Sequence, residues 1–251
     1  VDNVRNLIKP ETKLVICTHA SNVFGFRFPI ERICALCHAY GILFCVDSAQ
    51  SAGVFDIDVG TNQYDFVCMS GHKSLYGPMG TGVLILNNRN LKPLLYGGTG
   101  TESVKKSQPE GLPEKFESGT QNMNGISGLK AGVDFVKNRG IKNIYNHEYK
   151  LAKRLFNGLA NNRKVITYNK SFDYGKVAPV VSFNIDGVYS EDLVAKLNKY
   201  GIMTRGGLHC SPLAHTTMNT IENGTVRVVP GAFNTINDIN YLLNVIRKLT
   251  N

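Results

Sequence analysis

Hydrophobic and polar positions follow two different patterns in the first third of the chain. Apolar, partly β-branched runs at 13–19, 43–47 and 66–69 are typical of buried strands. Apolar residues with helical spacing at about 29–40 separate the first two runs. A further apolar run at 81–86 follows a turn rich in glycine. This order predicts an α/β fold, in which helices flank a parallel or mixed sheet.

The remainder of the chain predicts a second, smaller unit. A connection rich in Gly, Pro and Ser at 87–121 is long for a compact domain, which indicates a functional or interfacial role. A helical region follows at about 125–161. The later pattern predicts strands at 165–169, 177–185, 203–207 and 225–230, a helix at 190–201, and a last helix capped by Thr235 or Asn234. We therefore expect three parts: 1–125, part of a large domain; 126–161, connecting helices; and 162–251, a small C-terminal α+β domain.

Two polar residues follow neighbouring predicted strands. Asp47 ends the apolar run in LFCVDSAQSAG, and Lys73 comes just after the run in FVCMSGHKSLYGPMG. The carboxyl ends of parallel strands are where open α/β sheets bind ligands. A lysine that forms a Schiff base with pyridoxal phosphate, and an aspartate that keeps its pyridine nitrogen protonated, need such a pair. Taken alone, Lys73 is more typical of a solvated lysine in a surface turn, and it is the pairing with Asp47 that favours the chemical role.

These two segments resemble the aspartate and lysine motifs of fold-type I pyridoxal-phosphate enzymes in the class V aminotransferase group. Four further segments are similar to its cysteine desulfurase and selenocysteine lyase branch: THASNVFG (18–25), KFESGTQNMNGISGL (115–129), RGGLHCSPLAH (205–215) and GTVRVVPGAFNT (224–235). The resemblance implies a pyridoxal-phosphate transferase fold with helices on both faces of the large-domain sheet. Because family members begin well upstream, it also implies that this chain is the C-terminal two-thirds of a longer protein, with a truncated large-domain sheet.

The resemblance also implies roles for particular residues. Lys73 would form the Schiff base, and Asp47 would contact the pyridine nitrogen of the cofactor. The remaining expected cofactor contacts are Gln50 and Asn22 at the phenolic oxygen edge, Ser70 and His72 at the phosphate, and Thr120 at the phosphate of the neighbouring subunit. A homodimer with shared sites follows from the last of these. Without the resemblance, turn or cap chemistry would be the preferred explanation for Ser70 and Thr120.

Three residues near the C-terminus are candidates for substrate chemistry. Arg227 lies in the apolar run TVRVVP, where burial is costly unless the guanidinium binds an anion, such as a substrate carboxylate or a structural salt-bridge partner. Arg205 is expected to support the same loop or the substrate. Cys210 lies in the polar run GGLHCSP, so we expect it to be more exposed than the other five cysteines. A structural free thiol is the alternative to a catalytic one.

In cysteine desulfurases a mobile-loop cysteine takes the substrate sulfur as a persulfide, and neighbouring His209 or Arg205 would favour the thiolate of Cys210. The resemblance therefore implies conversion of L-cysteine to L-alanine, with an amino acid substrate and a sulfur-acceptor protein as partners. Selenocysteine lyase and class V aminotransferase activities also need Lys73 and Asp47 but not Cys210. A catalytically incomplete module that serves in dimerisation or docking is a further alternative.

Composition narrows the class of protein. The 251 residues hold no apolar run of membrane-spanning length and no signal or transit peptide, so we expect a cytoplasmic protein without a membrane partner. The net charge is +9, but basic residues are scattered and the cluster of Lys105 and Lys106 lacks aromatic neighbours, so we expect no nucleic-acid partner. The six cysteines lack a disulfide spacing, and Cys34 and Cys37 form a lone CxxC pair, so we expect reduced thiols and no metal site.

Overall fold

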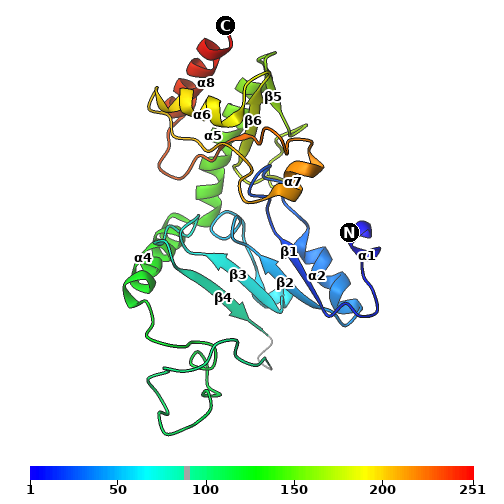
Figure 1. The fold of residues 1–251 in the computed structure, drawn as a ribbon, viewed down its shortest axis with the longest axis vertical. Helices are drawn as coiled ribbons and strands as arrows, with labels where there is room; N and C mark the ends of the chain where they lie inside the picture. The colour runs from blue at the N-terminus through cyan, green and yellow to red at the C-terminus, as the bar shows by residue number, and fades with distance from the viewer. Residues whose placement is uncertain (88–90) are drawn as a thin grey trace.

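A computed structural model describes residues 1–87 and 91–251 and contains two sheets joined by a long helix (Figure 1). The first sheet has the order β1-β2-β3-β4, with three parallel strands and an antiparallel fourth. Its strands are β1 (Leu14–Thr18), β2 (Leu43–Asp47), β3 (Phe66–Ser70) and β4 (Gly82–Leu86). The mixed α/β sheet predicted from the hydrophobic pattern is therefore confirmed.

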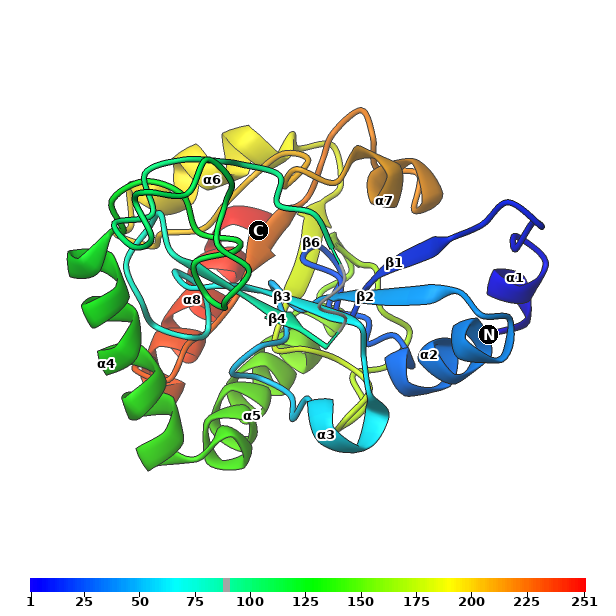
Figure 2. The same ribbon diagram turned by 90° about the horizontal axis from the view of Figure 1, so that it is seen from below.

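Helix α2 (Ile30–Ala39) connects β1 to β2 and covers one face of this sheet. Its buried residues recur at helical spacing, and they pack against Phe44, Val46 and Val67. On the opposite face, Ile16 and Leu84 are 67% and 55% exposed. Within the described residues α2 packs on one face of this sheet and lies to one side of β1 and β2 (Figure 2). Two short helices, α1 (Asp2–Arg5) and α3 (Val59–Asn62), complete this region.

The predicted helical region consists of two helices, α4 (Met123–Arg139) and α5 (Ile141–Ala160), separated by Gly140. Figure 1 shows α5 rising from the first sheet into the second half of the molecule, with α4 beside β4. The described residues of the connection before α4 contain neither helix nor strand, and Figure 1 shows them as a loop extending beyond the end of β4. The two helices therefore link the sheets.

The second sheet is antiparallel, in the order β5-β6-β7. Its strands are β5 (Val165–Thr167), β6 (Val181–Ile185) and β7 (Val226–Val228), and its flanking helices are α6 (Ser190–Asn198), α7 (Pro212–Thr217) and α8 (Ile236–Thr250). The core of this half includes Leu155, Phe183, Leu193 and Leu243, which come from α5, β6, α6 and α8. The backbone N–H of Thr235 donates to Asp238 Oδ2 at 2.8 Å in a capping box, so Thr235 caps α8.

One predicted strand is missing from this sheet. Residues 203–207 meet β7 only at an isolated bridge between Arg205 and Arg227. The two sheets lie within 1–125 and 162–251, and the bounds of the three expected parts stay a prediction.

Candidate active site

Polar side chains stand at the carboxyl ends of two neighbouring parallel strands. Asp47 is the last residue of β2 and Ser70 the last of β3, and Asp47 lies in register with Cys68. The turn after β3 carries Lys73 and is closed by a hydrogen bond from Gly77 N to Gly71 O of 2.8 Å. The structure therefore brings Asp47 and the Lys73 turn to the ligand-binding edge of the sheet.

The turn that carries Lys73 is clamped between two other backbone segments. A Cβ on Gly53, whose φ is +81°, would lie 2.1 Å from Ser74 O, and one on Gly132 would lie 2.2 Å from Leu75 O. The segment after Asp47 and helix α4 therefore touch the turn backbone to backbone, which only glycine permits. This close packing fixes the point from which the Lys73 side chain extends.

A cavity of about 270 Å³ opens beside the turn, near the lower end of the size range of small-molecule sites, roughly 300–1,000 Å³. Its lining includes Lys73, Gln50 and Arg227. The Lys73 side chain remains accessible to solvent, yet burial of its amine lowers its pKa, and Arg227 lowers it further, while Asp47 and Cys210 raise it. These charges therefore surround one amine, although they come from separate parts of the chain.

The Asp47 carboxylate is half-buried, and Oδ1 accepts a hydrogen bond from Ala49 N at 3.0 Å. At the end of β3, Ser70 Oγ and His72 Nδ1 lie 3.2 Å apart and form a polar pair that faces solvent. Thr120 is exposed and is not part of the cavity lining. Of the predicted cofactor residues, Gln50 and Lys73 line the cavity, and Asp47 lies near enough to affect the Lys73 amine. The roles of all of these residues, including Thr120, stay predictions.

Two guanidinium groups border the same region. The backbones of Arg205 and Arg227 pair through hydrogen bonds of 2.8 and 3.3 Å, and Arg227 Nη1 donates to Asn22 O at 2.7 Å. Burial lowers the pKa of Arg227, and the neighbouring charge of Arg205 lowers it further. Within residues 1–87 and 91–251, no ion pair with an acidic side chain involves either arginine. Two neighbouring cations without an acidic partner in the described part of the chain are suited to bind an anion.

Cys210 is the exposed cysteine among the six, whereas the others are buried or half-buried. Its Sγ lies 4.0 Å from Arg205 Nη2. The expectation that His209 would assist the thiolate is wrong, because this ring is buried and its Nε2 lies 2.9 Å from Thr225 O. Burial and the nearby Arg227 lower the pKa of His209 to about 4, so the ring is neutral near pH 7. Arg205 is therefore the cation next to the sulfur.

The structure adds three residues that the sequence patterns did not single out. Glu148 of α5 lines the cavity, is 3% exposed, and accepts a hydrogen bond from the Tyr76 hydroxyl at 3.0 Å. The oxygen of the Tyr76 hydroxyl in turn accepts a hydrogen bond from Ala232 N at 3.2 Å. Ser211 Oγ donates to Asn22 Oδ1 at 2.8 Å. The sequence could have indicated Glu148, because a charged residue there occupies the buried face of an amphipathic helix. No comparable sequence feature marks Ser211.

The donor set fits pyridoxal phosphate, the cofactor expected from the sequence. An amine of lowered pKa suits its carbonyl carbon, and the Asp47 carboxylate, which has no cationic partner among the described residues, suits a protonated nitrogen. The Ser70 hydroxyl and the His72 imidazole at the end of β3 suit a phosphate. The arginines remain for the carboxylate of a substrate.

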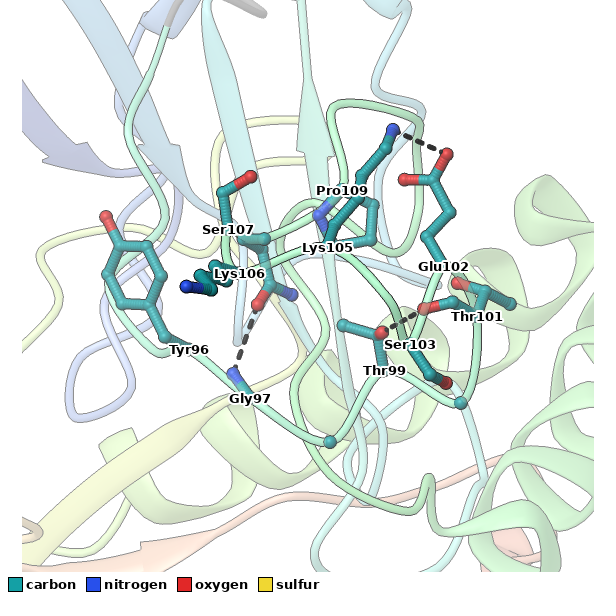
Figure 3. A pocket seen from close by; sticks show the side chains of 13 residues that line it. Tyr96, Gly97, Thr99, Thr101, Glu102, Ser103, Lys105, Lys106, Ser107 and Pro109 are labelled. Carbon is teal, nitrogen blue, oxygen red and sulfur yellow. Dashed lines mark hydrogen bonds and ion pairs between the residues drawn. The ribbon is translucent and has the colours of Figure 1, made fainter.

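A separate hollow of about 460 Å³ lies within the loop at 96–109 and shares no lining residue with the cavity beside Lys73 (Figure 3). Gly97 N donates to Gln108 Oε1 at 3.1 Å, and Lys105 pairs with Glu102 at 2.8 Å. The basic cluster noted in the sequence is therefore partly neutralised within its own loop.

Among the residues that the structure describes, no group of three His, Cys, Asp or Glu side chains is arranged to hold a metal ion. Cys34 and Cys37 belong to α2, and both are buried as free thiols. Across the same described ranges, none of the helices combines the length and the apolar character that crossing a membrane requires.

Comparison with known proteins relates the whole chain to one family. Residues 1–242 match the model of the family described as Aminotransferase class-V. A probable cysteine desulfurase of Pyrococcus abyssi is 36% identical over 94% of this chain, and one of Halalkalibacterium halodurans is 34% identical over 99%. The chain spans 59% and 61% of the lengths of these relatives.

Solved structures agree with these relatives. An apo cysteine desulfurase from Thermococcus onnurineus NA1 superposes on 95% of this chain with a TM-score of 0.88 and 35% identity, and this chain covers 60% of it. The cysteine desulfurase CsdA of Escherichia coli superposes on 98% with a TM-score of 0.88 and 29% identity, and is covered over 61%.

Proposed function

Because this chain belongs to the class V aminotransferase family, we propose that it carries the reaction centre of a pyridoxal-phosphate-dependent cysteine desulfurase, which converts L-cysteine to L-alanine. The observation that supports this proposal is the convergence of four groups from separate segments. Asp47, Arg227 and Cys210 all lie near enough to shift the pKa of Lys73. Lys73 and Arg227 line one cavity, and Cys210 Sγ lies 4.0 Å from Arg205, whose backbone pairs with that of Arg227. A carboxylate, two cations and an exposed thiol are the groups that this reaction needs.

Lys73, Asp47, Gln50, Asn22, Ser70 and His72 would hold the cofactor. Pyridoxal phosphate, when bound, supplies an electron sink that weakens the bonds around the substrate Cα. The lowered pKa of Lys73 increases the neutral fraction of its amine near pH 7, so Nζ can take a proton from the substrate Cα and return it. The Asp47 carboxylate stabilises a positive charge on the ring nitrogen of the cofactor.

Arg227 binds the carboxylate of the amino acid. One of its N–H groups is used by Asn22 O, and the others remain for a ligand. Arg205 strengthens the local positive field, because the two guanidinium groups are close enough to lower the pKa of Arg227.

Cys210 accepts the sulfur. Its thiolate attacks the substrate sulfur, an S–S bond forms, and the bond between Cβ and sulfur breaks. The electron pair of the broken bond stays with Cβ, which takes up a proton, so that cysteine and the protein thiol become alanine and a persulfide. Arg205, 4.0 Å from Sγ, offsets the negative charge of the attacking thiolate.

Alanine formation from L-cysteine by the complete protein, loaded with pyridoxal phosphate, tests this function. We expect Lys73→Ala and Cys210→Ser to abolish persulfide and alanine formation, and Cys34→Ala, a control on helix α2 outside the cavity lining, to retain them. Undiminished alanine formation in Cys210→Ser would exclude the sulfur-transfer step. Activity with selenocysteine alone, or transfer of the amino group to a keto acid, would instead identify a selenocysteine lyase or an aminotransferase.

We also propose a homodimer in which Thr120 reaches the site of the neighbouring subunit. Mixing Lys73→Ala protein with Thr120→Ala protein tests it, because a mixed dimer contains one site with an intact lysine and an intact threonine. Recovery of activity on mixing is expected, and no recovery would place Thr120 outside the shared site. Sedimentation gives the oligomeric state independently.

The persulfide sulfur is proposed to pass to an acceptor protein in the cytoplasm. Transfer of radioactive sulfur from loaded Cys210 to cytoplasmic proteins with reduced thiols is the corresponding measurement, and loss of all label to free sulfide would contradict an acceptor.

A further inference from the structure

The loop that carries Cys210 is fastened to a distant segment by one side chain. Asn22 Nδ2 donates to His209 O at 2.7 Å, and Ser211 Oγ donates to Asn22 Oδ1 at 2.8 Å. The amide of Asn22 therefore contacts the residue before Cys210 and the residue after it. Figure 1 shows the corresponding proximity of α7, which follows this loop, to the segment after β1.

The fastened loop has an unfavourable backbone conformation. His209 and Cys210 have φ values of +52° and +61°, in the left-handed region that residues other than glycine rarely adopt. Two consecutive strained residues persist only where surrounding contacts hold them. The two hydrogen bonds to Asn22 are comparable in strength with this strain, so the loss of either favours relaxation of the loop.

We propose that Asn22 and Ser211 are positioning residues for Cys210, which rests on the proposed function of Cys210 as the sulfur acceptor. Their hydrogen bonds hold Cys210 in the strained conformation that places Sγ beside Arg205. Arg227 supports the same arrangement, because its Nη1 donates to Asn22 O at 2.7 Å. The group that binds the substrate carboxylate and the group that takes the sulfur are thus both tied to Asn22.

Ser211→Ala isolates this effect. Ser211 precedes α7, but its side chain makes no capping hydrogen bond, so the substitution removes the bond to Asn22 and leaves the helix start unchanged. We expect amide hydrogen exchange of residue 211, whose N–H donates to Leu208 O at 2.9 Å, to become about fivefold faster, which is the effect of losing one net hydrogen bond. Ser211→Thr, which keeps a hydroxyl, should restore slow exchange. Ser171→Ala, which removes an exposed bond to Asp173, is the matched control and should leave the loop unchanged.

A second variant removes the other hydrogen bond. Asn22→Asp replaces the donor to His209 O with an acceptor, so the amide of residue 211 should again exchange faster in the chain without cofactor. Unchanged exchange of this amide in both variants, with α8 still protected, would overturn the proposal. This measurement needs no activity, so it stays informative if Cys210→Ser leaves alanine formation intact and the proposed function fails.

Kinetics of the complete, cofactor-loaded protein separate positioning from substrate binding. Ser211→Ala leaves Arg227 in place, so we expect kcat for persulfide formation to fall about fivefold while KM for cysteine stays the same. A rise in KM with unchanged kcat would contradict a role in positioning the thiol.

Discussion

Replacing Glu148 with glutamine should change how the free energy of unfolding depends on pH. Burial raises the pKa of Glu148 from 4.5 to about 7, against the opposing effects of the Tyr76 hydrogen bond and the charge of Arg139. Between these pH values the folded state holds a proton that the unfolded state has released. Rising pH therefore favours the unfolded state through this group, and its destabilising effect is complete above pH 7.

The size of the effect follows from the two pKa values. At about 1.4 kcal/mol per pH unit, the interval from 4.5 to about 7 corresponds to about 3 kcal/mol. Glutamine has no charge to bury, and its carbonyl oxygen can still accept the Tyr76 hydrogen bond. We therefore expect the Glu148→Gln variant to be more stable than the parent protein by up to about 3 kcal/mol at pH 8, with the difference shrinking to near zero toward pH 4.5.

Urea unfolding of both proteins between pH 4.5 and pH 8, followed by circular dichroism, measures this difference. The test uses the difference in stability between the two proteins rather than either curve alone. Protonation of His19 and His209 in the unfolded state also changes the stability of both proteins in this pH range. Burial lowers the pKa of each histidine to about 4 in the folded protein. The free energy of unfolding therefore decreases as pH falls below 6.5, because only the unfolded state takes up these protons. Glu11→Gln, at an exposed glutamate, should give parallel curves. A difference for Glu148→Gln that does not vary with pH would refute the reasoning.

Three further substitutions test the packing. Gly53→Ala places a Cβ 2.1 Å from Ser74 O at a φ of +81°, so we expect a loss of at least about 2 kcal/mol in urea unfolding, against little change for Gly111→Ala, where the space is open. Leu155→Ala, at a fully buried position, should lower the free energy of unfolding by about 2–5 kcal/mol, whereas Leu94→Ala, 92% exposed, should change it by less than about 0.5 kcal/mol. Thr235→Ala removes the cap of α8 and should cost about 1 kcal/mol, which Thr235→Ser should largely recover; an equal loss in both variants would exclude capping as the cause.

Local patterns predicted much of the first sheet and part of the site. The four apolar runs became β1–β4, and both polar breaks, at Asp47 and after Ser70, fall at strand ends. Strand ends are readable because a change from apolar to polar residues marks the point where the chain leaves the core. The cap at Thr235 was readable for a similar reason, since capping depends on residues within one turn.

Other features depended on contacts between distant segments. The orientation of His209 toward Thr225, the isolated bridge at Arg205 and the contact of Asn22 with Ser211 join parts of the chain that no local pattern relates. Glu148 lies in an ordinary amphipathic helix, and only the position of α5 against Tyr76 places its carboxyl in the cavity wall.

The sequence by itself determined the order of the strands in the first sheet, the positions of Asp47 at a strand end and Lys73 just after one, and the resemblance to class V aminotransferases, because these depend on residue type and spacing along the chain. Only the tertiary structure decided which charges surround the Lys73 amine and which side chain holds the Cys210 loop. Electrostatic shifts and hydrogen bonds act over a few ångströms of space, and the separation of two residues along the chain does not specify that distance.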